Sequence, residues 1–427
     1  MLAINRKAMH FRAIIITAIV TAIWIFEPVS AQNQYNLQQA LQATKTNNPM
    51  LKKEQLNVNI AETDIVTASL RPNPILNNQS LQLVKASKFP DNTGWGNHLN
   101  RQVWWQVTKP FEMPQLRKNK IDFANQNVIL NQKAFKETER NLFQDVASKW
   151  LDVWSARKQL DILNIAKNNI DSLVIINKVR LKNQVITTTD LARTELLANQ
   201  YKVQMKSADQ NYKNEITNLK YLMGIQDDVN VDTTDNFQFA FPANVDDLLQ
   251  QALQSRSDIQ TLKSTIDVAN ANIKLQKSMA LPVPELGAIF NPQNGAPYLG
   301  VYGTIAIPIF SRNQGEIRKS KVLKQQAEQD LLATQSLVQS EISTAFSSYQ
   351  TQKQNLLNFT GLLTQSQTIL NNVKYAYLRG GTTIIDFLEA QRSWLDTQQQ
   401  YYETLQLYRQ SYIKLLYASG IINQIAQ

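Results

Sequence analysis

Apolar positions recur at helical spacing along four stretches of the chain, and the positions between them are rich in Gln, Ser and Lys. The clearest seam consists of Leu323, Ala327, Leu331, Val338, Ile342, Ala345 and Tyr349. Its steps of mostly three, four or seven are typical of a coiled coil. The pattern predicts two long helices, roughly Gln115–Arg180 and Asn313–Leu378, and two returning helices, about Thr188–Leu222 and Thr383–Ser419. At 1.5 Å per residue, a helix of about 65 residues spans nearly 100 Å.

Each long helix is predicted to end at a tight turn before its returning helix. In the second turn, Gly380-Gly381 is a strong helix stop. Thr382-Thr383 can then cap the next helix. Asp386 and Glu389 follow in its first turns, where negative charge suits a helix N-terminus. Thr187–Leu191 has the same arrangement in the first half, so the sequence predicts two helical hairpins with polar tips.

Strand-like segments precede each long helix. Ile75–Lys85 and His98–Thr108 predict one β-hairpin, and Glu285–Phe290 and Tyr298–Ile309 predict a second. Prolines at spacing two stop the preceding helices in Arg71-Pro72-Asn73-Pro74 and in Leu281-Pro282-Val283-Pro284. Trp95, Trp104 and Trp105 cluster on the first hairpin. They fit the interfacial aromatics of outer-membrane barrels, and the alternative is three tryptophans packed in an ordinary core.

One spacing relates the two halves of the chain. Asp386 follows Asp190 by 196 residues, and Tyr221 with Tyr417 and Gly224 with Gly420 keep that spacing. It indicates a duplicated unit, with a first repeat at 32–225 and a second at 248–427. The hairpins lie at about 75–108 and 285–309. The linker 226–247 is acidic and polar, with alternating Phe237, Phe239 and Phe241. We expect it to be a partly ordered connector in the equatorial region, lying against the helices.

The N-terminus is typical of a secretory signal peptide, residues 1–31. Arg6, Lys7 and Arg12 precede an apolar run, Ala13–Phe26, which is shorter than the roughly 20 residues of a membrane span. The chain has 44 basic and 34 acidic residues. Cleavage removes three basic residues and Glu27, leaving 41 against 33, a net charge of +8. The basic residues are dispersed, so nucleic-acid binding is not expected.

Composition also limits the chemistry. The chain has no cysteine, so it has no thiolate metal site and no acylated N-terminal cysteine. After cleavage it keeps one histidine, His98, which we expect on a strand or loop surface rather than at a metal. No cofactor, metal site or catalytic residue is predicted, and the protein is not expected to be an enzyme. An exported coiled-coil structural protein or adhesin stays as an alternative, although it has no use for the strand hairpins.

Four strands in one chain cannot close a barrel, and open strand edges cannot face lipid. The sheet could belong to a soluble exported protein, or several chains could share one barrel. Three chains would supply twelve strands and a wide lumen. The long helices would then continue from the barrel as a tube.

The duplicated order, the paired Pro-x-Pro stops and the second tip resemble TolC-like outer-membrane efflux channels. The most specific segment is Tyr377, Gly380 and Ile385–Ala390, supported by Thr189-Asp190-Leu191. The resemblance covers essentially the whole chain after the signal peptide. It implies a homotrimer with an outer-membrane β-barrel and a periplasmic α-helical barrel. It also implies a passive exit duct for efflux or type I secretion, with a periplasmic membrane-fusion adaptor and an inner-membrane pump of the RND or ABC type as partners.

The resemblance also assigns site residues. Asp386 and Glu389 would line the periplasmic entrance, whereas the alternative is that they only stabilise the helix N-terminus. A latch would consist of Tyr377 with Asp190 and Thr189. Relatives can carry an arginine where this chain has Thr382, so the latch would be wired differently. The adaptor would dock on the two tips, at Leu181, Val185, Leu378, Gly380 and Gly381. The cargo is not encoded in any of these positions.

Overall fold

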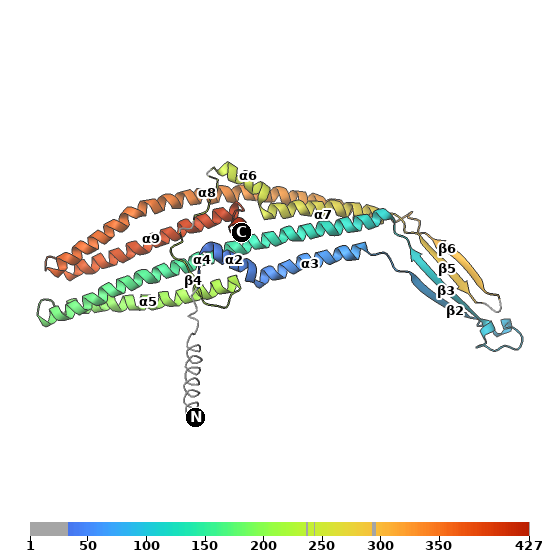
Figure 1. The fold of residues 1–427 in the computed structure, drawn as a ribbon, viewed down its shortest axis with the longest axis horizontal. Helices are drawn as coiled ribbons and strands as arrows, with labels where there is room; N and C mark the ends of the chain where they lie inside the picture. The colour runs from blue at the N-terminus through green and yellow to red at the C-terminus, as the bar shows by residue number, and fades with distance from the viewer. Residues whose placement is uncertain (1–32, 236–237, 243, 293–295, 427) are drawn as a thin grey trace, which may run out of the picture.

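The computed structural model describes residues 33–235, 238–242, 244–292 and 296–426. Helices form an elongated body, and strands extend from one end of it (Figure 1). The first half contains β1 (Asn33–Tyr35), α2 (Leu37–Asn47), α3 (Pro49–Ser69), β2 (Ile75–Gln82), β3 (Arg101–Pro110), α4 (Pro114–Lys182) and α5 (Thr188–Met223). The second contains β4 (Val229–Val231), α6 (Val245–Ser255), α7 (Ser257–Met279), β5 (Glu285–Asn291), β6 (Tyr298–Thr304), α8 (Gln314–Leu378), α9 (Ile384–Ala418) and α10 (Ile422–Ile425). The signal-peptide segment lies outside the described residues.

The four long helices confirm the sequence pattern to within two residues at each end. α4 and α8 extend from the strands toward the opposite end of the body, and α5 and α9 return to its middle (Figure 1). Ala327, Val338 and Ile342 are buried as the seam predicted, whereas Leu323 at the strand end of α8 is 43% exposed. Leu323 is therefore the exposed position of the seam, since Leu331, Ala345 and Tyr349 are partly buried.

The strands form one sheet in the order β2–β3–β5–β6, with every neighbouring pair antiparallel. Both predicted hairpins are confirmed, and pairing of β3 with β5 joins them. β6 ends at Thr304 rather than at Ile309, because its partner β5 begins at Glu285, opposite Thr304. Pro284, which precedes β5, has no N–H for a further ladder bond. The outer strands β2 and β6 each keep one edge unpaired within the described residues.

The register of β3, β5 and β6 gathers large apolar side chains on one face of the sheet. They are Val103, Trp105, Val107, Leu286, Ala288, Phe290, Leu299 and Val301. Leu299 is 81% exposed and Val301 is 90% exposed. The opposite face is more polar, with Gln106, Thr108, Glu285, Tyr302 and Thr304. β2 is mixed, since Leu76 joins the apolar face but so do Asn78 and Ser80. An exposed apolar face of this kind marks contact with a membrane or another protein.

The tryptophans of the first hairpin do not form a core. Trp95 is 64% exposed in the loop, and Trp105 is 44% exposed on the apolar face. The register places Trp104 on the face opposite Trp105. The alternative of an ordinary tryptophan core is therefore wrong for Trp95 and Trp105. His98 is exposed in a short 3-10 turn before β3, as predicted.

The largest core lies at the middle of the body, where the two halves meet. Trp150 and Trp154 of α4 are fully buried there among side chains of α2, α5, α7, α8 and α9. Their indole N–H groups donate to the main-chain oxygens of Tyr35 at 2.9 Å and Thr233 at 3.4 Å. Full burial of large aromatics that also satisfy their polar atoms stabilises this junction strongly.

The linker is more ordered than the sequence indicated. Its segment Val229–Val231 forms β4, which pairs in parallel with β1 at Asn33–Tyr35. Phe239 stacks on Tyr412 with centroids 6.4 Å apart, and Phe241 meets the same ring at 5.4 Å. The prediction that the linker lies against the helices is confirmed for these two residues. Phe237 lies outside the described residues.

A buried arginine closes the junction of the second half. Arg256, 2% exposed, donates to Asp258 Oδ2 at 2.6 Å and Glu341 Oε2 at 2.7 Å. It also donates to the main-chain oxygen of Ala418 at 2.8 Å. Asn48 has the corresponding position in the first half, because its side-chain amide donates to the main-chain oxygen of Leu222, near the end of α5, at 2.7 Å. Ala418 follows Leu222 by 196 residues, the spacing of the repeat.

Candidate functional site

Matching caps begin the returning helices at both tips. Thr187 and Asp190 form a capping box on α5, and Thr383 and Asp386 form one on α9. Gly380 has φ +79° and ends the preceding turn. A residue with a Cβ rarely adopts this left-handed conformation, which explains the glycine at this position. The predicted caps and the glycine stop are confirmed.

Asp386 is held in its ionised form by the threonines before it. One oxygen, Oδ2, accepts bonds from Thr382 Oγ1 at 2.6 Å, Thr383 Oγ1 at 2.7 Å and the Thr383 N–H at 3.1 Å. The bond from Thr382, then those from Thr383, lower the pKa of Asp386 below its usual range. These bonds stabilise the carboxylate because they are made to its charged form. Asp386 and Glu389 are both exposed at the tip.

Tyr377 lies at the centre of the contacts between the two hairpins. Its side chain is 3% exposed, and its hydroxyl donates to Asn177 Oδ1 of α4 at 2.7 Å. The Arg180 guanidinium lies over its ring at 4.6 Å and donates to its main-chain oxygen at 3.2 Å. On the other side, its ring is 5.5 Å from that of Phe387. Tyr377 therefore joins α8 to both α4 and α9.

The hydrogen bonds continue from Tyr377 into the first tip. Asn177 Nδ2 donates to Thr194 Oγ1 at 2.9 Å, and Thr194 Oγ1 donates to the main-chain oxygen of Asp190 at 2.9 Å. Asn177 and Thr194 are fully buried. The chain of bonds reaches Asp190 only through its backbone, because the carboxylate of Asp190 caps its own helix through Thr187.

The tip surfaces expose apolar side chains. Val185 is 60% exposed and Leu378 is 45% exposed, while Leu181 is partly covered. Gly380 and Gly381 are exposed beside Leu378. Within the described residues, no group of three or more His, Cys, Asp or Glu side chains could hold a metal ion. Among the described helices, none has the length and apolar character needed to cross a membrane.

The second half of the chain matches a known family. Residues 248–420 match the model described as outer membrane efflux protein. The second half of the chain thus carries an outer membrane efflux protein domain. The resemblance to efflux channels is thus confirmed. A comparison with curated protein sequences gives no significant match.

Solved structures of channel proteins share the fold of this chain. A structure of CusC, described as showing changes that accompany folding and transmembrane channel formation, has 19% identity and a TM-score of 0.74, covering 92% of each chain. The CmeC outer membrane channel of Campylobacter jejuni has 16% identity and a TM-score of 0.73, covering 90% of this chain and 85% of CmeC. The open state of the MtrE outer membrane channel of Neisseria gonorrhoeae has 16% identity and a TM-score of 0.71, covering 90% of this chain and 88% of MtrE. These matches are to channel proteins rather than enzymes.

The predicted latch pairing needs correction. The hydroxyl of Tyr377 bonds to Asn177 and not to the Asp190 carboxylate, since that carboxylate is used by the α5 cap. Thr189 lies exposed on the first turn of α5, away from the buried chain of bonds. The sequence analysis missed Asn177, Thr194 and Arg180. One signal was available for Asn177, because this polar residue continues the apolar series Ile170, Leu173 at helical spacing.

Proposed function

We propose that the protein is the outer-membrane channel of a tripartite efflux or type I secretion system. It would be a passive exit duct across the periplasm and outer membrane for drugs, cations or other small molecules. The observation that carries this proposal is the amphipathic sheet with two unpaired edges, whose strands lead into helices long enough to cross much of the periplasm. Three copies would pair these edges into a closed twelve-stranded barrel, with the apolar faces toward lipid.

The tips support the assignment of partners. We infer that a periplasmic membrane-fusion adaptor docks on the exposed residues Val185, Leu378, Gly380 and Gly381 and on the partly covered Leu181. An inner-membrane pump of the RND or ABC type would deliver the cargo. The carboxylates of Asp386 and Glu389 would line the periplasmic entrance, and Tyr377 would latch it. The proposed function needs no cofactor, because transport energy would come from the pump.

The assembly is tested on the full-length protein expressed with its signal peptide. We expect a trimer that requires detergent for extraction from the outer membrane and that forms conducting channels in planar bilayers. Light scattering corrected for bound detergent gives the protein mass. A water-soluble monomer that forms no channels would contradict the proposal, and a soluble fibrous oligomer would favour the structural or adhesin alternative.

The loop of the first hairpin is expected to face outside the cell. Asn92 is exposed in this loop, at the end of the sheet farthest from the helices. We expect Asn92→Cys to react with a membrane-impermeant maleimide in intact cells, since the native chain has no cysteine to compete. Asn211→Cys on α5 is the periplasmic control and should react only after the outer membrane is broken. The same late reaction at position 92 would reverse the proposed orientation.

Tyr377→Phe is expected to raise the resting conductance of the channel. The change removes one hydroxyl and leaves Asn177 Oδ1 buried without that donor, which costs roughly 1–3 kcal/mol. The free energy that holds the two hairpins together should fall accordingly. Single-channel recordings at fixed voltage measure the open fraction. Tyr375→Phe is the matched control, because Tyr375 is 57% exposed two residues away. Equal open fractions in the two variants would show that the Tyr377 hydroxyl does not hold the tip.

A further inference from the structure

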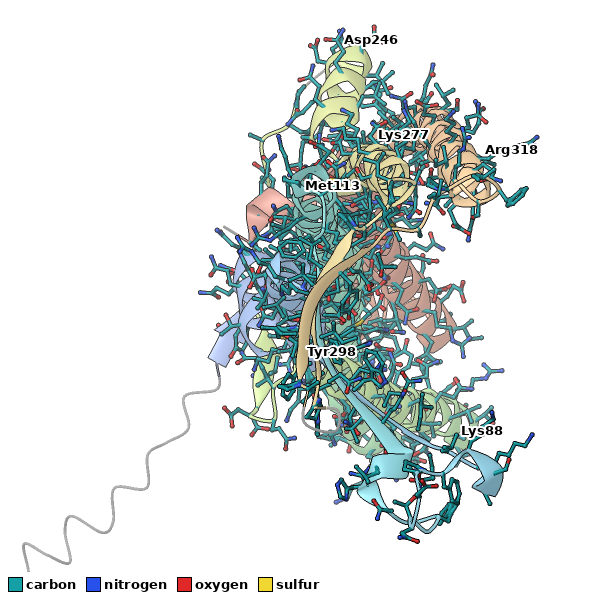
Figure 2. The ribbon with its side chains drawn as sticks, turned by 90° about the vertical axis from the view of Figure 1, so that its right-hand side faces the viewer. Lys88, Met113, Asp246, Lys277, Tyr298 and Arg318 are labelled. Carbon is teal, nitrogen blue, oxygen red and sulfur yellow. The ribbon has the colours of Figure 1, made fainter. Side chains whose placement is uncertain are left out.

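A pocket with four cationic side chains among prolines and apolar residues lies where β3 leads into α4. Its volume is about 440 Å³. Arg71, Lys109, Arg117 and Lys118 line it together with Glu112. Figure 2 looks at the molecule from its strand end and labels Met113, next to Glu112, at this boundary between sheet and helices. Four cations against one carboxylate give the pocket an excess of positive charge.

The neighbouring groups do not neutralise these cations. Glu112 already pairs with Lys120, with Oε1 at 2.5 Å from Nζ. Arg117 Nε donates to the main-chain oxygen of Ser69 at 2.8 Å, and Lys109 Nζ donates to that of Pro72. Carbonyl oxygens orient a cation but leave its net charge in place. Within the described ranges, none of the four cations makes an ion pair with a carboxylate, and Arg71 and Lys118 are exposed.

The pocket lies at the end of the apolar face of the sheet. Lys109 follows Val103, Trp105 and Val107 on that face of β3, at the end nearest the helices. Phe111, 48% exposed, adds an apolar wall. A ligand with acyl chains along the apolar face would therefore place an anionic head group beside Lys109. Lysine near such a boundary keeps its stem on apolar surface and its charge at the polar edge.

The second half provides an internal comparison. The prolines at 72 and 110 correspond to those at 282 and 308, so Arg71 corresponds to Leu281 and Lys109 to Ile307. Leu281 is 49% exposed and Ile307 is 75% exposed. Arg312 is the one cation in the segment that joins β6 to α8 there. A cluster of cations is thus not needed for the turn itself.

We propose that this pocket binds the phosphate of a phospholipid head group at the periplasmic boundary of the outer membrane. The inference rests on the proposed function, which places the apolar face of the sheet in lipid. Arginine and lysine side chains bind phosphate through charge-assisted hydrogen bonds. Clusters of such residues beside a membrane recognise anionic lipid. The bound lipid would fix the depth at which the first hairpin enters the membrane.

The test uses the full-length protein in detergent, titrated with dioleoyl-phosphatidylglycerol and followed by native mass spectrometry. Arg71→Ala with Lys118→Ala removes two exposed cations from the pocket. Lys202→Ala with Lys206→Ala is the matched control, because it removes the same charge from exposed positions on α5, far from the sheet. We expect the pocket variant to bind the first lipid at least ~10-fold more weakly than the wild type and the control to bind it equally well.

Two further probes identify the source of the phosphate. Dioleoylglycerol has the same acyl chains without phosphate, and we expect it to show no preference for the wild type over the pocket variant. Inorganic phosphate at the same concentration should leave no adduct. Equal lipid binding by the wild type and the pocket variant would overturn the proposal. Inorganic phosphate binding as tightly as the lipid would assign the pocket to a soluble anion and overturn it too. The oligomer mass and the channel conductance of the same samples show whether the proposed channel forms, independently of whether the pocket binds lipid.

Discussion

Asp386→Asn combined with Glu389→Gln is expected to abolish most of the cation selectivity of the reconstituted channel. In a trimer, the two positions would place six carboxylates around the periplasmic entrance. Rings of carboxylates favour cations, and multivalent cations bound between them can obstruct the opening. We expect the permeability ratio of potassium over chloride to approach one. The concentration of a trivalent cation that gives half block should rise roughly tenfold or more.

The amide variants separate charge from helix capping. Asparagine at position 386 keeps an oxygen that can accept the bonds from Thr383, so the α9 cap persists while the charge is lost. Asp190→Asn with Glu195→Gln is the control, because Asp190 caps α5 with the same geometry. If the Asp386→Asn, Glu389→Gln variant keeps the cation selectivity and the cation block of the wild type, the role of Asp386 is limited to capping the helix.

Selectivity should also depend on pH in a defined direction. The bonds from Thr382 and Thr383 lower the pKa of Asp386, so its carboxylate is charged at neutral pH. Protonation should therefore reduce the selectivity only below about pH 4, the range of an ordinary aspartate or lower. Repulsion among the carboxylates at a tip closed by three copies would act in the opposite direction, because like charges raise each other's pKa. Loss of selectivity well above pH 4 would show that this repulsion outweighs the threonine bonds.

Arg256→Ala is expected to destabilise the protein by about 3–5 kcal/mol. The change leaves Glu341 without its buried cation and Asp258 with only the more distant Arg140, and the oxygen of Ala418 loses its donor. The melting temperature of the helical signal in detergent, followed by circular dichroism, measures the effect. Arg318→Ala on α8 is the control, because Arg318 is exposed, and a change within about 0.5 kcal/mol is expected there. Equal melting temperatures for the two variants would contradict the importance of this network.

Lowering the pH should reduce the difference in melting temperature between Arg256→Ala and the wild type. Burial opposes ionisation of Asp258, but the bonds and charge of Arg256, then the charge of Arg140, outweigh it and hold the pKa of Asp258 below its usual value. A lowered pKa stabilises the folded state above the unfolded pKa of about 3.9, and that contribution is lost as the pH falls through the folded value. The variant lacks the part of this contribution that Arg256 supplies, so the melting temperatures of the two proteins should converge below about pH 4.

The features that could be predicted from the sequence depend on patterns of residues that are close together in the chain. The seam of α8, the stop at Gly380 and the caps at Thr187 and Thr383 each depend on residues within a few positions of one another. The two hairpins also follow from short alternating segments bounded by prolines. Such signals need no knowledge of which distant elements meet, and this is why the helix bounds agree so closely.

The features that it missed depend on distant contacts. The bond from Tyr377 to Asn177 joins residues 200 positions apart, and the bond from Arg256 to Ala418 joins residues 162 positions apart. The residues near Asn177 and Arg256 in the sequence do not indicate which distant residues these two side chains contact. The Tyr377–Asp190 pairing came from family resemblance, which did not account for the use of the Asp190 carboxylate in its own helix cap.

The pairing of β1 with β4 has a consequence for how the chain would fold if it is exported across the inner membrane as we propose. Asn33 pairs with Val229, so the segment that emerges first must stay unpaired until almost 200 further residues have followed. Tyr35 likewise accepts the bond from Trp150 only after much of α4 has emerged. Contacts between residues so far apart form late, because closing a long loop costs entropy before the contact contributes any favourable free energy. During the proposed export, the leading end of the protein would thus stay exposed to periplasmic chaperones and proteases, and the junction between the halves would be completed last.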